Sequence, residues 1–188
     1  MAADLIRRGF LSLLTAALVA ACAATPASAP AAKSSAEPVA VTRFFLVRHG
    51  EKEAGSDPAL TPAGAERAKA LAERLKAEGV TEIWSTRTRR TQQAAAPMAA
   101  QTGLVVQTYD ATTLPAFASW LLDVPGVKLV VGHSNTTGEL AALLGADPGP
   151  PIDDAREFDR LYVISVDADG IVRSRIERYG ARSPLASK

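Results

Sequence analysis

The stretch Phe44-Phe45-Leu46-Val47-Arg48-His49-Gly50 is an apolar run that stops at a charged residue, a histidine and a glycine. A second run of this kind, residues 129–133 (LVVGH), ends in His133, and the chain has no other histidine. Short apolar runs that are bounded by small or polar residues predict buried strands. Because ligand sites in open α/β sheets lie beyond the carboxyl ends of the strands, we expect both imidazoles to meet in one crevice.

Outward from these two runs, strand and helix patterns alternate along the chain. Strand patterns cover residues 41–47, 80–84, 104–109 and 127–131, followed by a hairpin of 161–166 and 171–176. Helix patterns cover residues 88–102, 117–122 and 136–144, and an earlier segment that opens at Thr61-Pro62 and is stopped by Gly79. Thr136 and Glu139 form a capping-box pattern at the start of the last helix. The alternation predicts a three-layer α/β/α sandwich with a mostly parallel central sheet and a C-terminal antiparallel hairpin.

The composition is that of a globular protein with balanced charge. Of 188 residues, 47% are apolar and 22% are charged, and the formal net charge is +1. Without Asp4, Arg7 and Arg8, basic and acidic residues are equal in number. Proteins that bind nucleic acid present a clustered basic face, so the composition argues against nucleic acid as a partner.

The amino terminus has the pattern of an export signal. Arg7 and Arg8 precede an apolar stretch, residues 10–21, that is too short to span a bilayer, which predicts a signal peptide over residues 1–21. Residues 18–22 (LVAAC) resemble a bacterial lipoprotein processing box, which would make Cys22 the lipidated first residue. An ordinary signal peptide with a coincidental cysteine is the alternative. Residues 7–11 (RRGFL) also resemble a twin-arginine export signal.

The remaining chain divides into a tether, a domain and a tail. Residues 22–40 are rich in Ala, Pro and Ser and predict a tether. A folded domain is expected over residues 41–180 and a tail over 181–188. The predicted location is the bacterial cell envelope or periplasm, with membrane contact only through the N-terminal lipid anchor.

Three segments carry candidate chemistry. After the first strand, Arg48 offers a planar fork for phosphate or carboxylate oxygens, a neutral His49 imidazole can attack phosphorus, and Gly50 lets the backbone approach a ligand. Residues 85–92 (STRTRRTQ) crowd arginines at the start of a helix, against the helix dipole, which indicates an anion site. After the strand at 127–131, His133 could donate a hydrogen bond to a phosphoryl oxygen as charge develops there.

Taken together, these segments resemble the histidine phosphatase superfamily, also called phosphoglycerate-mutase-like. Arg48-His49-Gly50 matches its R-H-G signature, and residues 57–64 (DPALTPAG) resemble its D-x-x-L-T-x-x-G segment. Residues 85–94 match its S-x-x-x-R-A-x-Q-T-A segment with Arg89 at the arginine position, although Arg90 then stands where alanine is usual. Residues 132–135 match its G-H-S-N segment.

The resemblance implies roles for these residues. His49 would be the nucleophile that becomes phosphohistidine, and Arg48, Arg89 and His133 would hold the phosphoryl oxygens. Substrate contacts are expected from Gly50, Ser134 and Asn135. No metal and no cofactor are implied.

The general acid that protonates the leaving group is left open. Many family members take it from an insertion after the second motif, but here that stretch is short and holds Asp110, with Asp123 further on. Glu51 and Glu53 lie nearer the nucleophile in sequence. A buried carboxyl group could have the raised pKa that this role needs, but the sequence does not choose among these residues. We name Glu51 and Asp110 as the candidates.

The predicted function is therefore an exported phosphatase. It would hydrolyse a phosphomonoester or a phosphoramidate, carried by a small molecule or a phosphoprotein, through phosphohistidine on His49. The alternative is a non-catalytic lipoprotein that binds phosphate or a phosphorylated ligand without turnover. A purely structural envelope protein would leave the matched histidines and the crowded arginines unexplained.

Overall fold

The computed structural model describes residues 41–183. The predicted signal peptide, the tether with Cys22 and most of the predicted tail lie outside the described residues. None of the helices in the described part of the chain combines the length and the apolar character needed to cross a membrane.

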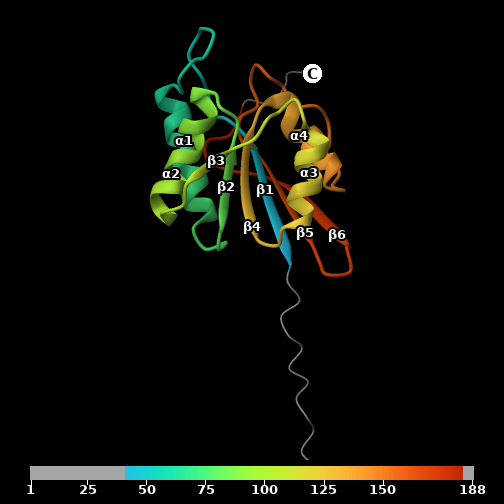
Figure 1. The fold of residues 1–188 in the computed structure, drawn as a ribbon. Helices are drawn as coiled ribbons and strands as arrows, with labels where there is room; N and C mark the ends of the chain where they lie inside the picture. Colours follow the sequence, from blue (N-terminus) through green and yellow to red (C-terminus); the bar gives the residue numbers. More distant parts are fainter. Residues whose placement is uncertain (1–40, 184–188) are drawn as a thin grey trace, which may run out of the picture. The chain divides into compact units, whose positions relative to one another are not determined.

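One six-stranded sheet organises the domain (Figure 1). Its strands are β1 (Thr42–Arg48), β2 (Glu82–Ser85), β3 (Val106–Thr108), β4 (Val127–Gly132), β5 (Arg160–Val166) and β6 (Val172–Arg178). Their order is β3-β2-β4-β1-β5-β6, so β3 and β6 are the edges. Strands β1 to β4 are parallel to one another, β5 is antiparallel to β1, and β6 is antiparallel to β5. The mostly parallel sheet with a terminal hairpin confirms the prediction.

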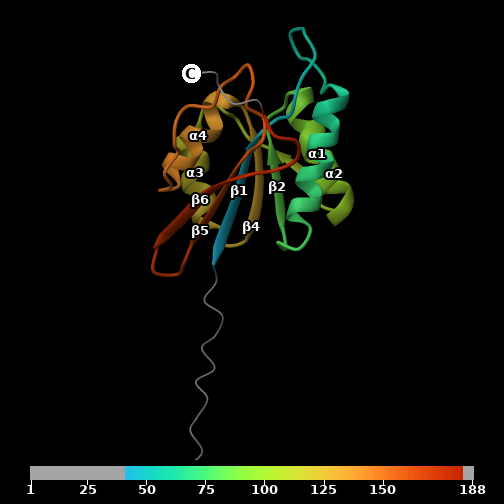
Figure 2. The same ribbon diagram turned by 180° about the vertical axis from the view of Figure 1, so that it is seen from behind.

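The helices are α1 (Pro62–Leu75), α2 (Arg89–Thr102), α3 (Leu114–Asp123) and α4 (Ser134–Leu143). They form the two outer layers. Side chains of β1 alternate between the two faces of the sheet, so each face packs against a different pair of helices. Phe45 and Val47 pack with residues of α1 and α2, whereas Phe44 and Leu46 pack with residues of α3 and α4. Seen from both sides, α1 and α2 cover one face and α3 and α4 the other (Figures 1 and 2). This is the expected three-layer sandwich.

Two predicted helix starts were too late. Helix α4 begins at Ser134 rather than at 136, and the Thr136 hydroxyl accepts the backbone N–H of His133 at 3.1 Å. Thr136 therefore lies inside the first turn, and His133 occupies the cap position that the pattern assigned to Thr136. Helix α3 begins at Leu114 instead of 117. Both helices begin closer in sequence to the preceding strand than predicted. The connection from β4 to α4 is a single residue, His133.

The connection from β1 to α1 is held by close backbone packing. Thr61 caps α1 as predicted, since its side chain accepts the N–H of Gly64 at 3.1 Å. A β-carbon on Gly64 would lie 2.2 Å from the backbone oxygen of Glu51, and one on Gly50 would lie 2.9 Å from the backbone of Gly64. The two glycines therefore let the first turn of α1 touch the chain that follows His49.

We expect Gly64→Ala to destabilise the domain. In a helix, alanine is ordinarily better than glycine by about 1 kcal/mol, but here the added methyl group collides with fixed backbone, at a cost of about 1–3 kcal/mol. Gly138→Ala in α4 is the matched control, because its β-carbon would meet the Tyr162 hydroxyl at an ordinary 3.5 Å. Urea unfolding of both variants measures the difference. Equal stability changes in the two variants would contradict the packing argument.

Candidate active site

The pairing of β1 with β4 brings the two histidines together. The strands are parallel neighbours with Arg48 level with Gly132, and the backbone N–H of His49 donates to the Gly132 oxygen at 3.1 Å. His49 and His133 therefore follow adjacent strand ends. Their ring centroids are 5.5 Å apart in an edge-to-face arrangement. The two residues line one pocket of about 360 Å³, as the sequence predicted.

The His49 imidazole is buried and neutral. Its side chain is almost fully buried, and Nδ1 lies 2.8 Å from the backbone oxygen of Gly50. A carbonyl only accepts, so Nδ1 carries the proton and the lone pair is on Nε2. Burial lowers the pKa of His49 to about 3, with a further contribution from the charges of Arg48 and Arg90. The imidazole is therefore uncharged at neutral pH, which is the form that can attack phosphorus.

His133 is also neutral, and its tautomer is set by two neighbours. Nη2 of Arg90 lies 3.3 Å from Nδ1, and the Thr86 hydroxyl lies 2.9 Å from Nε2. Arginine only donates, so Nδ1 accepts and Nε2 carries the proton. Burial, followed by the charge of Arg90, lowers the pKa of His133 to about 4. The ring is thus a polar neighbour of His49 that adds no charge to the pocket.

The guanidinium of Arg48 is buried behind the pocket. It donates to the backbone oxygens of Asp153, Asp154 and Glu157 at 2.7–3.1 Å and to the Asp154 carboxylate at 2.7 Å. The guanidinium lies over the Phe158 ring, with 4.2 Å between the guanidinium carbon and the ring centre. Arg48 was expected to hold phosphoryl oxygens. In this structure most of its donors instead hold the loop before β5.

The pocket arginine is Arg90 and not Arg89. Arg90 lines the pocket and contacts His133, whereas the Arg89 side chain is exposed and only its backbone N–H is engaged, by the Asp57 carboxylate at 3.0 Å. The prediction for Arg89 was wrong by one residue. The helix pattern carried the missing signal, because Arg90 precedes the buried Ala94 by four positions and so shares its face of α2.

Two buried N–H groups lack partners at this site. In the described part of the chain, Nε of Arg48 and Nε of Arg90 are the buried side-chain nitrogens without a hydrogen-bond acceptor. A buried donor that stays unpaired costs free energy, more so when it belongs to a charged group. Both belong to cations next to the two histidines, so an anion that accepts from them would remove this cost. The arrangement fits a tetrahedral oxyanion such as a phosphoryl group.

Neither leading candidate for the general acid has a raised pKa. Burial alone would raise the pKa of Glu51, but hydrogen bonds from Arg67 at 2.7–3.2 Å outweigh it and bring the pKa below its usual value. Asp110 lies in a neighbouring hollow that His133 also lines, and hydrogen bonds from Thr112 lower its pKa. Both carboxyl groups are ionised at neutral pH, so the proposed acid role is not supported for either.

The predicted substrate contacts divide into two groups. Ser134 and Asn135 line the pocket, as expected. Gly50 does not, and its contribution is the backbone contact with α1 and the oxygen that accepts from His49. Besides Arg90, two lining residues were not predicted, Lys52 and Asp154. Asp154 comes from a proline-rich loop, and no sequence pattern connects it with the histidines.

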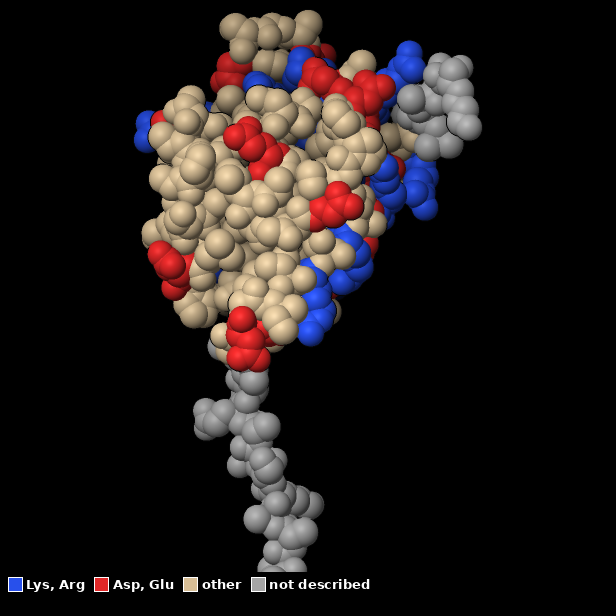
Figure 3. All heavy atoms as spheres, turned by 90° about the vertical axis from the view of Figure 1, so that its right-hand side faces the viewer, with Lys and Arg blue, Asp and Glu red and all other residues tan. Residues whose placement is uncertain are grey.

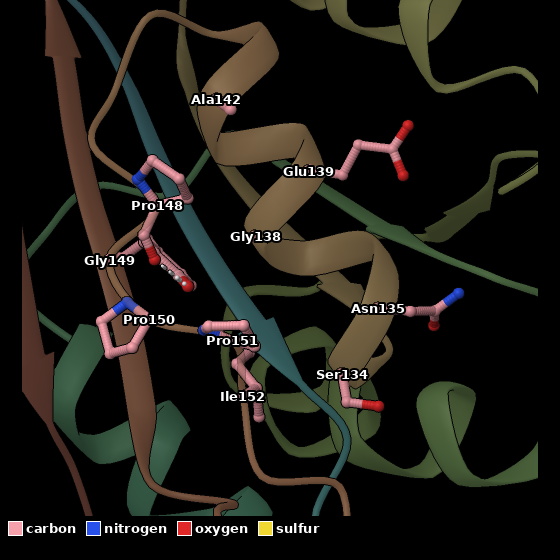
Figure 4. A pocket seen from close by; sticks show the side chains of 11 residues that line it. Ser134, Asn135, Gly138, Glu139, Ala142, Pro148, Gly149, Pro150, Pro151 and Ile152 are labelled. Carbon is pink, nitrogen blue, oxygen red and sulfur yellow. Dashed lines mark hydrogen bonds between the residues drawn. The ribbon is translucent and has the colours of Figure 1, made fainter.

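A groove adjoins the pocket at Ser134 and Asn135. It runs between α4 and the segment 148–152, which lies alongside the helix, and its walls are mainly proline, glycine and alanine (Figure 4). The surrounding face is largely uncharged (Figure 3), because α3 and α4 contain only Asp123 and Glu139 as charged residues. The hollow with Asp110, which shares His133 with the pocket, is lined mainly by polar side chains. A bound phosphoryl group could therefore carry a leaving group toward either hollow.

Among the described residues, no group of three or more His, Cys, Asp or Glu side chains is arranged to hold a metal ion. The polar groups of the pocket are instead two imidazoles, the cations Arg90 and Lys52, and the Asp154 carboxylate.

Comparison with known families gives one match. Residues 44–113 match the model of the histidine phosphatase superfamily (branch 1). This range contains Arg48, His49 and the segment with Arg90. No curated protein sequence matches the chain.

Solved structures with the same fold include several phosphatases. The protein histidine phosphatase SixA, complexed with tungstate, superposes with a TM-score of 0.59 at 18% identity, covering 73% of this chain and 97% of that one. A mycobacterial glucosyl-3-phosphoglycerate phosphatase gives 0.56 at 19% identity, covering 76% and 100%. A phosphoserine phosphatase from Entamoeba histolytica gives 0.53 at 14% identity, covering 75% and 98%. At these identities the likeness establishes the fold.

The one-residue difference between the two arginines can be tested directly. Arg90→Ala should weaken inhibition by inorganic phosphate about 10- to 100-fold, because a hydrogen bond to a charged group contributes about 1.5–3 kcal/mol. Arg89→Ala keeps the backbone N–H that Asp57 accepts and should change the inhibition constant by less than about twofold. A larger effect at Arg89 than at Arg90 would show that our placement of the anion is wrong.

Proposed function

We propose that the chain is a histidine-type phosphatase of the histidine phosphatase superfamily, which hydrolyses a phosphomonoester or a phosphoramidate through phosphohistidine on His49. The observation that carries the mechanism is the state of His49. The ring is buried and neutral, its Nδ1–H is fixed on Gly50, and Nε2 keeps its lone pair beside two cations with unpaired N–H groups. This combination serves a nucleophile that attacks an anionic phosphoryl group.

The reaction has two displacements at phosphorus. In the first, Nε2 of His49 forms a bond to phosphorus and the leaving group departs with the electron pair of its own bond. Arg90, and Nε of Arg48, would neutralise charge on the phosphoryl oxygens in the transition state. In the second, water attacks phosphorus, the N–P bond breaks, and neutral His49 is restored with release of phosphate.

The charges around the pocket favour substrates with good leaving groups. A poor leaving group needs a proton as it departs, but Glu51 and Asp110 both have lowered pKa values and are ionised at neutral pH. Phosphoramidates and activated esters need less help. Among the structural neighbours, one is a protein histidine phosphatase and another acts on a sugar phosphoglycerate, as their names state, and both substrate types fall within the proposed range.

Pre-steady-state kinetics test the mechanism. With para-nitrophenyl phosphate, the wild-type protein should release a burst of nitrophenolate equal to the enzyme concentration and leave phosphoenzyme that survives an alkaline quench. Because the pKa of His49 is about 3, the burst should persist at pH 5, where a histidine of ordinary pKa 6.5 would be mostly protonated. His49→Ala should lose the burst and reduce turnover by about 10³-fold or more.

A urea unfolding curve with a cooperative transition, as in the wild-type protein, should first show that the His49→Ala domain is folded. Full turnover in such a variant would refute the nucleophile. If the wild-type protein binds phosphate but gives neither burst nor turnover, it is a binding protein, as in the alternative drawn from the sequence.

We also propose that the phosphatase is exported and lipid-anchored through Cys22. The support is the sequence pattern of residues 1–22. In bacteria that process lipoproteins, the full chain should fractionate with membranes and incorporate labelled palmitate, and Cys22→Ser should lose both properties while it keeps phosphatase activity. Unchanged fractionation and labelling of Cys22→Ser would refute the anchor.

A further inference from the structure

Asp154 is the one carboxylate of the described residues that lines the pocket together with His49 and His133. The other acidic groups nearby are engaged elsewhere. Glu51 is paired with Arg67, and Asp110 accepts from Thr112 in the neighbouring hollow. Asp57 accepts the backbone N–H of Arg89 and pairs with Nη1 of Arg90 at 3.7 Å, but it does not line the pocket. If the reaction uses a carboxylate at phosphorus, Asp154 is the residue in position.

Two donors orient the Asp154 side chain. Nη2 of Arg48 donates to its Oδ1 at 2.7 Å and to its backbone oxygen at the same distance, and the Ser134 hydroxyl also donates to Oδ1. No hydrogen bond from residues 41–183 reaches Oδ2. The side chain is 73% exposed, so water has access to it. The carboxylate is thus held at one oxygen and open to water at the other.

The residues that hold Asp154 belong to the site itself. Arg48 directly precedes His49, and Ser134 directly follows His133. Arg48 also fixes the loop through the backbone oxygens of Asp153 and Glu157. The position of Asp154 therefore depends on the same strand ends that position the two imidazoles. This dependence argues against a loop charge that reaches the pocket by chance.

We propose that Asp154 is the general base that activates water for hydrolysis of the phosphohistidine. The inference rests on the proposed function. As the water oxygen bonds to phosphorus, one water proton passes to the Asp154 carboxylate and the electron pair of the N–P bond returns to Nε2 of His49. Phosphate leaves, and the proton on Asp154 is then lost to solvent.

The electrostatics favour a base over an acid. The Ser134 hydrogen bond, and the charge of Arg48, hold the pKa of Asp154 below its usual value, so the group is ionised at neutral pH. An ionised carboxylate can accept a proton in the second step but has none to give in the first. The site would then assist water and leave the leaving group unassisted. Assistance to water without assistance to the leaving group is a further reason to expect substrates with good leaving groups.

The test is Asp154→Asn with para-nitrophenyl phosphate. Asparagine can still accept from Arg48 and Ser134 but is a far weaker base. The burst should keep its amplitude and its rate within about threefold, while steady-state turnover should fall about 100-fold, the usual contribution of general acid–base catalysis at its lower end. Phosphoenzyme should accumulate in the steady state. Asp147→Asn, an exposed carboxylate of the same loop outside the pocket, should change none of these values.

A second measurement separates the base from a positioning role. Hydroxylamine attacks phosphorus without prior deprotonation, so it should accelerate dephosphorylation of Asp154→Asn by a larger factor than that of the wild type. Inorganic phosphate should inhibit the variant more strongly, because a negative charge has left the pocket. Loss of position alone would give weaker inhibition and no rescue.

The outcomes are distinct. Turnover that is unchanged in Asp154→Asn, or burst and turnover that fall by the same factor, would overturn the role of Asp154 while the wild-type burst still supported the proposed function. A wild-type protein that forms no phosphoenzyme would overturn the proposed function, and this inference with it.

Discussion

The hydrogen bond from the His49 backbone to Gly132 fixes the geometry on which the site depends. It continues the parallel ladder of β1 and β4 by one residue beyond Arg48, so both chains leave the sheet at the same level. A shift of one residue in this register would send alternate side chains to the other face of the sheet. The matched ends of two central strands therefore explain why residues so distant in sequence meet around one pocket.

The site concentrates buried positive charge, and its neighbours are arranged to tolerate it. Arg48 is stabilised by four loop contacts and by the Phe158 ring, yet one N–H remains unpaired. Uncharged imidazoles avoid adding more positive charge, since burial keeps the pKa of both histidines low. Such a site is incomplete without an anion. Asp154 compensates part of this charge, and the proposed phosphatase reaction would use both the remaining positive charge and the Asp154 carboxylate.

Much of this arrangement could be predicted from the sequence. The apolar runs before His49 and His133 predicted two of the strands, and the alternation of strand and helix patterns predicted the three layers. The position of both histidines at strand ends predicted that the imidazoles meet. Arg90 was missed because the motif placed Arg89 at the arginine position, and only the direction of the helix face shows which of the two adjacent arginines enters the pocket. Asp154 was not predictable, because its place depends on contacts of Arg48 with a loop that has no regular pattern. The start of α4 was placed two residues late, because the Thr136–Glu139 capping pattern lies inside the helix and not at its cap position.

The two edge strands of the sheet also determine whether the domain can pair with a strand of another protein chain. Edge strands expose backbone N–H and C=O groups that can recruit a strand of another chain. Here β3 has three residues and offers few such groups, and β6 carries the exposed Arg173, Arg175 and Arg178 along its length. An incoming strand would find either a short template or an edge of charged side chains that already pair with carboxylates of this domain. Intermolecular sheet growth, the first step toward fibrils, is therefore disfavoured at both edges of the described sheet.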